Sequence, residues 1–445
     1  MTGLVRRLGR IDALAIALGS VIGVGVFRAT GVVLRNSADF AQATAIWIIV
    51  GVVCMAGAIL YADMSARVPE AGGPYAYVRV AFGRPAAFVY GWMNGGISMP
   101  ARQASVMLVI GEVLASWLPG QARVWSASML VALVAINLFG VRAGAFVQRL
   151  LTTGKIATIL LVIGLAIAAS ASTSGAVPVS AAASAAASAA ASAAVSAAVS
   201  AAAPALSLAT AVSACWYSYI GWQDTTLLAE ELRHPSRDLP FVLVGSVAAV
   251  LALYTGIHIA VYTGLDGAAR SDLPARDLAV LVLGGVGFSL LSALMLSSMI
   301  GGAAEAIMVR PRIAMALARD GLAPAPIAAI DRRGTPYGAI LFHSSLAMFI
   351  VATGSFTQQL KLLGFAQGFL GLFETASFFV VRRRCPELPS RWYQLPAALV
   401  FVLANGALCV LTAREDPERI SVALALIGGI SIAYAATAAL RKRLA

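Results

Sequence analysis

Two short glycine-rich stretches hold the backbone chemistry that stands out in this chain. The first runs from Gly19 to Phe27 and includes Gly23 and Gly25, and the second is Tyr217–Trp222. Glycine allows the backbone to leave helical geometry and a ligand to approach it closely. Amides freed in this way, at the positive end of the helical segment that follows, can hold a carboxylate. The four-residue spacing of Gly19 and Gly23 also suits close helix packing, so the first stretch alone has two interpretations.

Both stretches interrupt long apolar segments. Of the 445 residues, 60% are apolar and 12% are charged, and the mean hydropathy is +0.86, whereas about a quarter of a soluble domain is charged. These values predict an all-α polytopic membrane protein with about twelve transmembrane helices. Non-helical backbone inside a bilayer is tolerated only where it lines a cavity or is buried in protein. Interrupted helices in comparable places in the two halves of a chain therefore indicate a binding site between inverted repeats, the layout of a transporter.

The distribution of charge predicts the orientation of these helices. The net charge of +12 is explained by basic cytoplasmic loops, so no nucleic-acid partner is implied. Most of the 32 Lys and Arg residues fall in alternate segments, which predicts a multi-pass protein of the cell (inner or plasma) membrane with both termini in the cytoplasm. The basic N-terminus has no small-residue cleavage site and is interpreted as a cytoplasmic tail. The predicted spans lie near 12–33, 41–62, 84–116, 125–140, 150–170, 206–226, 240–264, 278–309, 337–354, 358–381, 394–412 and 420–440.

The segment 170–205 consists almost entirely of alanine and serine, with a serine every four residues from Ser180 to Ser200. Alanine and serine enter a bilayer poorly compared with leucine or isoleucine. A span here would also move every later basic loop to the outside. We therefore predict an extracytoplasmic insertion between the fifth and sixth spans. It is interpreted as a tolerated low-complexity insertion, with a partner-binding element as the alternative.

Motifs along most of the chain resemble those of the amino acid–polyamine–organocation (APC) transporter superfamily, and in particular its bacterial and L-type amino acid permeases. The first break matches through Gly19, Ser20, Ile22, Gly23, Gly25 and Phe27. Further matches follow the second, sixth, eighth and tenth spans: Pro69, Ala71, Gly72, Gly73, Tyr75, Tyr77, Ala81, Phe82 and Gly83; Tyr219, Gly221, Trp222, Ala229, Glu230, Glu231, Pro235, Arg237 and Pro240; Arg312, Ala316, Arg319, Asp320, Gly321 and Pro324; and Pro386.

The resemblance implies a LeuT-like core of two five-helix inverted repeats in which the first and sixth helices are discontinuous. The repeats would occupy residues 1–169 and 206–385, with the insertion at 170–205 between them and two peripheral spans in 386–445. The implied function is a secondary active permease for amino acids that works by sodium-independent alternating access, as an exchanger or a proton symporter. The implied partners are the amino acid substrate, the lipid bilayer, a proton and a second copy of the chain, with no metal and no cofactor.

The resemblance also assigns a substrate site to the two breaks. The substrate carboxylate would bind the amides of Gly23, Val24 and Gly25, and the α-ammonium the carbonyls of Val21, Tyr217 and Ile220. Tyr217 would act as an aromatic gate. Val24 replaces the serine of the family motif, Ile220 would narrow the side-chain pocket, and Gln223 is neutral where a carboxylate would favour cationic substrates. We therefore expect small or medium neutral amino acids as substrates.

Lys155 opens the fifth predicted span. A lysine at a helix end usually extends its ammonium towards water. The resemblance instead implies that Lys155 reaches the unwound first helix and substitutes for the sodium of related carriers. Ser297 and Ser298 in the eighth span are candidate hydroxyl partners of Lys155.

Arg102, Glu305 and Glu374 fall inside predicted spans. Charges at such depth are costly and usually form pairs or face a cavity. A structural pair between Arg102 and Glu305 is the simpler hypothesis, and a proton-coupling or substrate-contact role is the alternative. Near the cytoplasmic loops, three further acids are expected to pair with neighbouring arginines: Asp63, Glu230 and Glu231.

Other classes of function receive less support. An intramembrane enzyme lacks an H-E-x-x-H motif and a plausible G-x-S-x-G triad, and the chain has only three histidines. A transporter-like sensor or assembly subunit without net transport remains an alternative, as does a carrier of polyamines or cationic amino acids.

Overall fold

The computed structural model describes residue 6 and residues 8–23, 25–139, 141–172, 208–265, 273–354, 356–415 and 417–444. Within these residues the chain is helical almost throughout, and the only β-type pairing is an isolated parallel bridge between Leu8 and Leu232. The predicted all-α class is therefore confirmed for this part of the chain. Val24 and nearly all of the alanine- and serine-rich insertion lie outside the described residues.

A helix is present in each of the twelve apolar runs predicted from the sequence. The first half comprises α1 (Arg10–Val21), α2 (Gly25–Arg35), α3 (Phe40–Arg67), α4 (Pro74–Gly91), the π-helix η1 (Trp92–Ser98), α5 (Met99–Trp117), α6 (Ala122–Leu138) and α7 (Val141–Ser172). The second half comprises α9 (Leu208–Tyr219), the 3₁₀ helix η2 (Trp222–Glu231), α10 (Pro235–Gly264), α11 (Pro274–Leu283), α12 (Gly285–Val309), α13 (Arg312–Arg319), the 3₁₀ helix η3 (Ala325–Ala328), α14 (Tyr337–Thr353), α15 (Phe356–Arg384), α16 (Gln394–Glu415) and α17 (Pro417–Leu444).

Length and apolarity identify fewer helices that could cross a membrane than the twelve predicted. Among the described residues four helical segments qualify, or six if two bent helix pairs each count as one span. One of these pairs is α1 with α2, bent by 42° at the first glycine-rich stretch. The structure thus agrees with a polytopic membrane protein.

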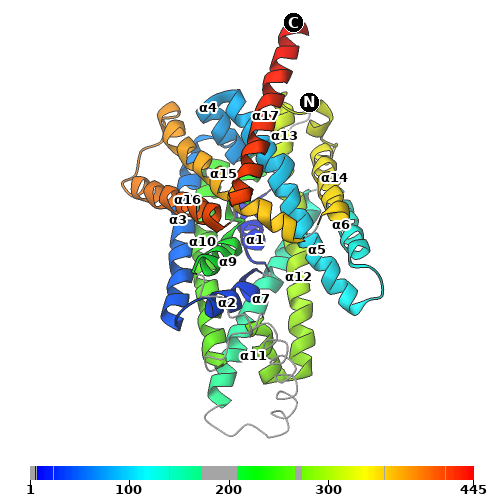
Figure 1. The fold of residues 1–445 in the computed structure, drawn as a ribbon, viewed down its shortest axis with the longest axis vertical. Coiled ribbons are helices and arrows are strands. Elements are labelled where there is room, and N and C mark those ends of the chain that lie inside the picture. The colour runs from blue at the N-terminus through cyan, green and yellow to red at the C-terminus, as the bar shows by residue number, and fades with distance from the viewer. Residues whose placement is uncertain are drawn as a thin grey trace.

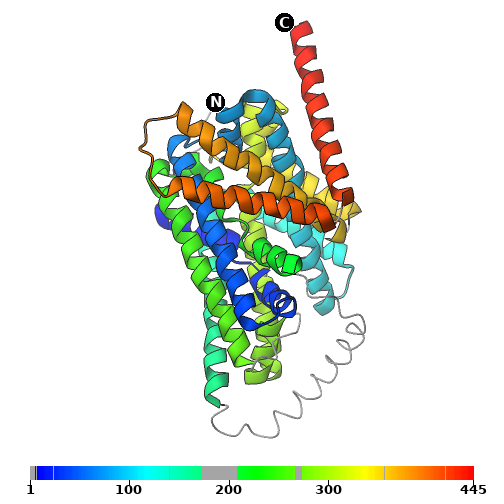
Figure 2. The same ribbon diagram turned by 60° about the vertical axis from the view of Figure 1, so that its left-hand side comes forward.

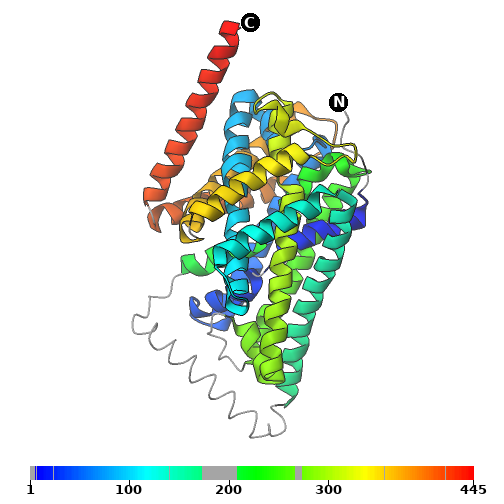
Figure 3. The same cartoon turned by 90° about the vertical axis from the view of Figure 1, so that its right-hand side faces the viewer.

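The long helices α3, α7, α10 and α12 run along the long axis of the molecule (Figure 1). Helices α15 and α16 cross the bundle obliquely, as Figure 2 shows. Helix α17 extends beyond the bundle in all three views (Figure 3). Helices α4 and α13 lie at the end of the bundle where α17 projects, and α11 lies at the opposite end (Figure 1).

Besides the spans that contain the two predicted breaks, a third predicted span is interrupted in the structure. The sequence predicts a continuous helix over 278–309, but α11 ends at Leu283 and α12 begins at Gly285. Gly284 between them has φ +61°, a left-handed conformation that glycine adopts without steric penalty. The apolar pattern continues across the glycine, so hydropathy alone could not locate this break.

Three aromatic side chains hold α9 against α3 and α10. Trp47, Tyr219 and Tyr254 are fully buried. Their ring centroids lie 6.0 Å apart for Trp47 and Tyr219, 5.7 Å for Trp47 and Tyr254, and 5.2 Å for Tyr219 and Tyr254. Tyr219 also donates its hydroxyl to the carbonyl of Trp47 at 3.2 Å. The end of α9 is thereby fixed where the second glycine-rich stretch begins.

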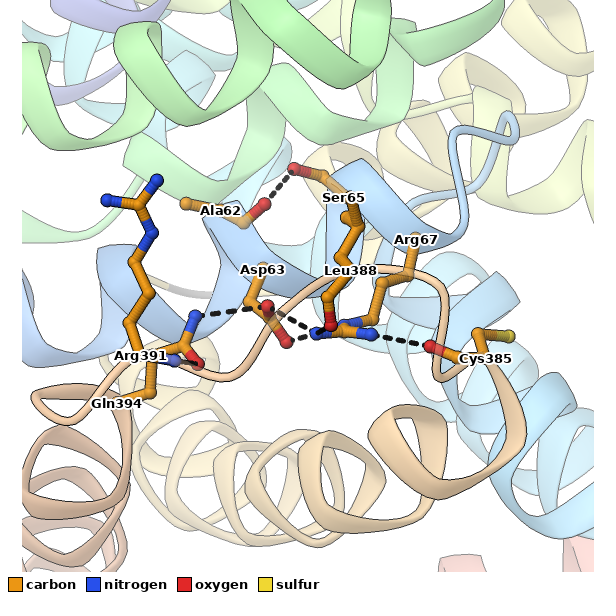
Figure 4. Close-up of polar contacts among 8 residues, drawn as sticks. All are labelled: Ala62, Asp63, Ser65, Arg67, Cys385, Leu388, Arg391 and Gln394. Carbon is orange, nitrogen blue, oxygen red and sulfur yellow. Dashed lines mark hydrogen bonds and ion pairs between the residues drawn. The ribbon is translucent and has the colours of Figure 1, made fainter.

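A buried clamp joins the end of α3 to the loop between α15 and α16 (Figure 4). Arg67 pairs with Asp63 at 2.9 Å and donates to the carbonyls of Cys385 at 2.5 Å and Leu388 at 2.9 Å. Asp63 also accepts from Gln394 at 3.0 Å. Both charged side chains are at most 5% exposed. Each therefore depends on the other to offset the cost of removing its charge from water.

The expected pairing of loop acids with arginines is confirmed at all three positions. Besides Asp63, Glu230 accepts from Arg319 at 2.7 Å and Glu231 from Arg312 at 2.6 Å. The last two pairs connect η2 with α13, the short helix that follows α12. The pair of Glu231 with Arg312 is fully buried, whereas that of Glu230 with Arg319 is about one third exposed.

Candidate functional site

The first break separates α1 from α2. Helix α1 ends at Val21, and Ile22 has an extended backbone with φ −72° and ψ 100°. Helix α2 begins at Gly25. The first amides of a helix have no partner within it and form its positive end. The break therefore presents donor groups at the start of α2.

The second break lies between α9 and η2. Helix α9 ends at Tyr219. Gly221 has φ +130°, a backbone conformation that residues with a Cβ atom rarely adopt. The chain then continues as a 3₁₀ helix from Trp222 to Glu231. The last carbonyls of α9 form its negative end. This break presents acceptor groups, the complement of those at the first break.

The two breaks lie against each other. A Cβ atom added to Gly221 would lie 2.7 Å from the carbonyl oxygen of Ser20. A Cβ atom added to Gly25 would lie 3.3 Å from Oγ of Ser218. Each break thus contacts a serine of the other half of the chain, and at Gly221 the approach leaves no room for a side chain.

The predicted backbone acceptors differ in their surroundings. The carbonyl of Val21 accepts from the hydroxyl of Tyr254 at 2.9 Å, and that of Tyr217 from the amide of Ile220 at 3.4 Å. A carbonyl oxygen has two lone pairs, so each retains capacity for one further donor. The side chain of Tyr217 is 41% exposed.

Lys155 braces the first break from α7. Its ammonium is buried and donates to the carbonyl of Gly19 at 2.6 Å. One turn earlier, Thr152 donates to the carbonyl of Ala15 at 3.0 Å. Helix α12 closes the other side, since a Cβ atom on Gly301 would lie 3.2 Å from Cε of Lys155. Lys155 therefore joins three elements next to the unwound residues of the first break.

The two serines proposed as hydroxyl partners of Lys155 form no hydrogen bond with it among the described residues. The Ser298 hydroxyl is buried and has no hydrogen-bond partner among the described residues. Ser297 is half-buried on the same helix. The contact that holds Lys155 is therefore the Gly19 carbonyl.

The hypothesis of a structural pair between Arg102 and Glu305 was wrong. Neither residue forms an ion pair in the described part of the chain, and both carboxylate oxygens of Glu305 lack a hydrogen-bond partner there. The buried pair is instead Asp224 with Arg310, at 3.0 Å and with side chains 1% and 8% exposed. Ser20 of the first break donates to the same oxygen of Asp224 at 3.5 Å.

Sequence reasoning missed Asp224 and Arg310. Asp224 lies three residues after Gly221 of the second break. An acidic residue inside a predicted span was the signal that could have identified it. Arg310 directly follows the apolar run predicted over 278–309. The pair connects η2 with the end of α12, and through Ser20 it also connects both with α1.

Glu374 of α15 has a different set of partners. It accepts from the hydroxyl of Tyr90 at 2.5 Å, and Asn94 donates to the same hydroxyl at 3.0 Å. Glu374 is 5% exposed. This predicted intramembrane acid therefore accepts a hydrogen bond from a neutral group, which a second neutral group supports.

Two cavities adjoin the second break and share Gln223 and Glu374. The first is mostly aromatic and apolar, and the second is polar. The first is lined by Cys54, Tyr61, Trp216, Ile220, Trp222, Gln223, Gly371, Glu374, Phe401 and Asn405. The second is lined by Pro74, Asn94, Met99, Arg102, Gln223, Asp224, Leu227 and Glu374.

Interrupted helices that meet beside two cavities, in a chain of apolar helices, are the layout of a membrane transport protein. The chain belongs to the amino acid permease family, whose family model matches residues 8–434. It is thus a transporter and not an enzyme, and the resemblance inferred from its motifs is confirmed.

Similar proteins cover almost the whole chain. The serine/threonine exchanger SteT of Bacillus subtilis (strain 168) is 24% identical over 442 residues, which is 96% of this chain and 95% of SteT. The large neutral amino acids transporter small subunit 2 of Rattus norvegicus is 24% identical over 95% of this chain and 79% of its own length. The b(0,+)-type amino acid transporter 1 of Homo sapiens is 25% identical over 82% and 74%, respectively. These similarities support an amino acid permease that works by exchange.

Proposed function

We propose that this permease exchanges small or medium neutral amino acids across the cell membrane without sodium. The observation that carries the proposal is the bond from the Lys155 ammonium to the Gly19 carbonyl. The fixed positive charge of this ammonium would stabilise the carbonyl groups beside the first break, as a bound sodium ion would. The names of two similar proteins, a serine/threonine exchanger and a large neutral amino acids transporter, support neutral substrates.

The proposed substrate site uses the opposite polarity of the two breaks. The carboxylate binds at the positive start of α2, through the amides of Gly23, Val24 and Gly25. The ammonium binds at the negative end of α9, through the carbonyls of Tyr217 and Ile220, and at the carbonyl of Val21. Helix dipoles favour this orientation at both ends. The neutral side chain of Gln223 gives no preference for a cationic substrate.

The proposed mechanism is alternating access between two inverted repeats, residues 1–169 and 206–385. The insertion 170–205 and the peripheral spans in 386–445 lie outside this core. Helices in all twelve predicted runs support this layout. We propose that both ends face the cytoplasm, where basic loops are retained.

Counterflow in proteoliposomes tests this function. Vesicles loaded with unlabelled serine should accumulate labelled serine equally well in sodium and in choline buffer. Uptake of arginine without uptake of neutral amino acids would exclude the proposed substrate class. Accumulation of labelled serine in vesicles without internal amino acid, driven by a pH gradient, would show proton symport and exclude obligatory exchange.

Replacing Lys155 by Ala tests the brace. Loss of a hydrogen bond to a charged group costs about 1.5–3 kcal/mol, so exchange should fall about tenfold to a hundredfold. Thr158→Ala, one turn along α7, removes a hydroxyl that donates to the Gly154 carbonyl of the same helix and serves as the matched control. Exchange by Lys155→Ala at the wild-type rate, with the protein folded, would refute the role of Lys155.

A further inference from the structure

The polar cavity between η1, α5, η2 and α15 contains more hydrogen-bonding groups than the backbone site uses. Arg102 of α5 and Asp224 of η2 line it, together with Asn94, Gln223 and Glu374. Gln223 accepts from the amide of Gly221 at 3.4 Å. The cavity therefore begins two residues from the second break, within reach of the side chain of an amino acid held there.

Two charged groups in this cavity have unused bonding capacity. Arg102 has no hydrogen bond or ion pair to any other described residue, so its guanidinium donors remain available to a ligand. Asp224 is 1% exposed, and its Oδ2 accepts from Arg310, but its Oδ1 has no partner in the described part of the chain. A buried carboxylate oxygen without a donor is costly, and this one belongs to a residue that lines the cavity.

The combined set of groups selects by charge. Asp224 and Glu374 would repel a carboxylate in the cavity, and Arg102 and Arg310 would repel an ammonium or guanidinium. An apolar side chain would leave the guanidinium of Arg102 and Oδ1 of Asp224 without partners after displacing any water. A carboxamide matches both, because its carbonyl accepts from a guanidinium and its NH₂ donates to a carboxylate.

We propose that this cavity is the side-chain subsite of the permease and that it favours carboxamide amino acids, glutamine and asparagine, over apolar amino acids of the same size. The proposal rests on the proposed function, since the substrate's amino and carboxyl groups must be held at the two breaks. Arg102 binds the side-chain carbonyl oxygen, and Asp224 accepts from the amide NH₂. Both residues thereby determine specificity within the neutral class.

Matched substrates test this proposal in counterflow with the wild-type protein. Glutamine is compared with methionine, asparagine with leucine, and glutamine with glutamate, pairs that are similar in size. A hydrogen bond to a charged group corresponds to about a tenfold to hundredfold preference. We expect kcat/KM for glutamine to exceed those for methionine and for glutamate by at least about tenfold.

The outcomes separate the two proposals. Exchange of methionine as efficiently as glutamine overturns the subsite alone, because neutral exchange persists. No exchange of any neutral amino acid overturns the proposed function and the subsite together. Exchange of glutamate better than glutamine also overturns the subsite, since it would assign the cavity to an anion.

Arg102→Met tests the assignment of the guanidinium. It should reduce the preference for glutamine over methionine about tenfold or more, whereas the control Arg276→Met on α11, outside the site, should keep it. An unchanged preference in Arg102→Met overturns the assignment. If Arg102→Met does not fold, the thermal shift of the wild-type protein decides: stabilisation by glutamine at concentrations where methionine has no effect supports the subsite, and equal stabilisation overturns it.

Discussion

Gly221→Ala is the perturbation that tests most sharply whether the two breaks touch. The native φ of +130° is one that residues with a Cβ rarely adopt, and the new methyl group would lie 2.7 Å from the carbonyl oxygen and 2.8 Å from Oγ of Ser20. Backbone strain of this kind costs about 1–3 kcal/mol. Because real Cβ atoms do not approach this closely, α1 and η2 must also move apart.

The effect is measured as the melting temperature of the purified protein and as serine counterflow. Gly221→Ala should lower the melting temperature and reduce exchange more than the loss of folded protein explains. Gly245→Ala on α10 is the matched control, since a Cβ there meets nothing within 4 Å and alanine favours a helix by about 1 kcal/mol over glycine. Wild-type melting and exchange in Gly221→Ala would refute the close contact of the breaks.

Three further predictions concern the buried charges. Arg67→Ala leaves Asp63 buried without its partner, so the protein should lose about 3–5 kcal/mol of stability and trypsin should cleave faster after Arg391. Arg319→Ala, which removes the partly exposed pair with Glu230, should cost at most about 1 kcal/mol. Equal melting temperatures of the two variants would contradict this prediction. Arg310→Met should destabilise by a similar 3–5 kcal/mol, and adding Asp224→Leu should recover most of the melting temperature but not the transport; no recovery would show that the pair is not the cause. The charge swap Arg102→Glu with Glu305→Arg should fold no better than the worse single variant, and restored melting would reinstate the pair that the structure lacks.

Hydropathy and glycine spacing predicted the helical segments and both breaks, because these features are local in the sequence. The break between α11 and α12 was missed although Gly284, Gly285 and Gly287 form a similar cluster, because the apolar pattern continues across them. The pairs of Glu230 and Glu231 with arginines were predicted because loops with opposite charges offer few other partners.

Side-chain pairing inside the bundle could not be predicted in the same way. Arg102 and Glu305 were paired because both are charged residues inside predicted spans. A position inside a span does not specify which sides of two helices are in contact. Asp224 and Arg310, 86 residues apart, meet only because η2 lies against the end of α12. The reach of Lys155 to the first helix followed from family resemblance. Its predicted position at a helix end was wrong, since α7 begins at Val141.

Protection of a cysteine at position 217 tests the central claim, that an amino acid binds between the two breaks. Tyr217 lies in the last turn of α9 beside the second break and is 41% exposed. Tyr217→Cys, in a chain whose four native cysteines are replaced, should therefore react with a maleimide. With counterflow still measurable in this variant, serine should slow the alkylation at the concentrations that half-saturate exchange. Alkylation at an unchanged rate while exchange proceeds would place the substrate elsewhere and contradict the account.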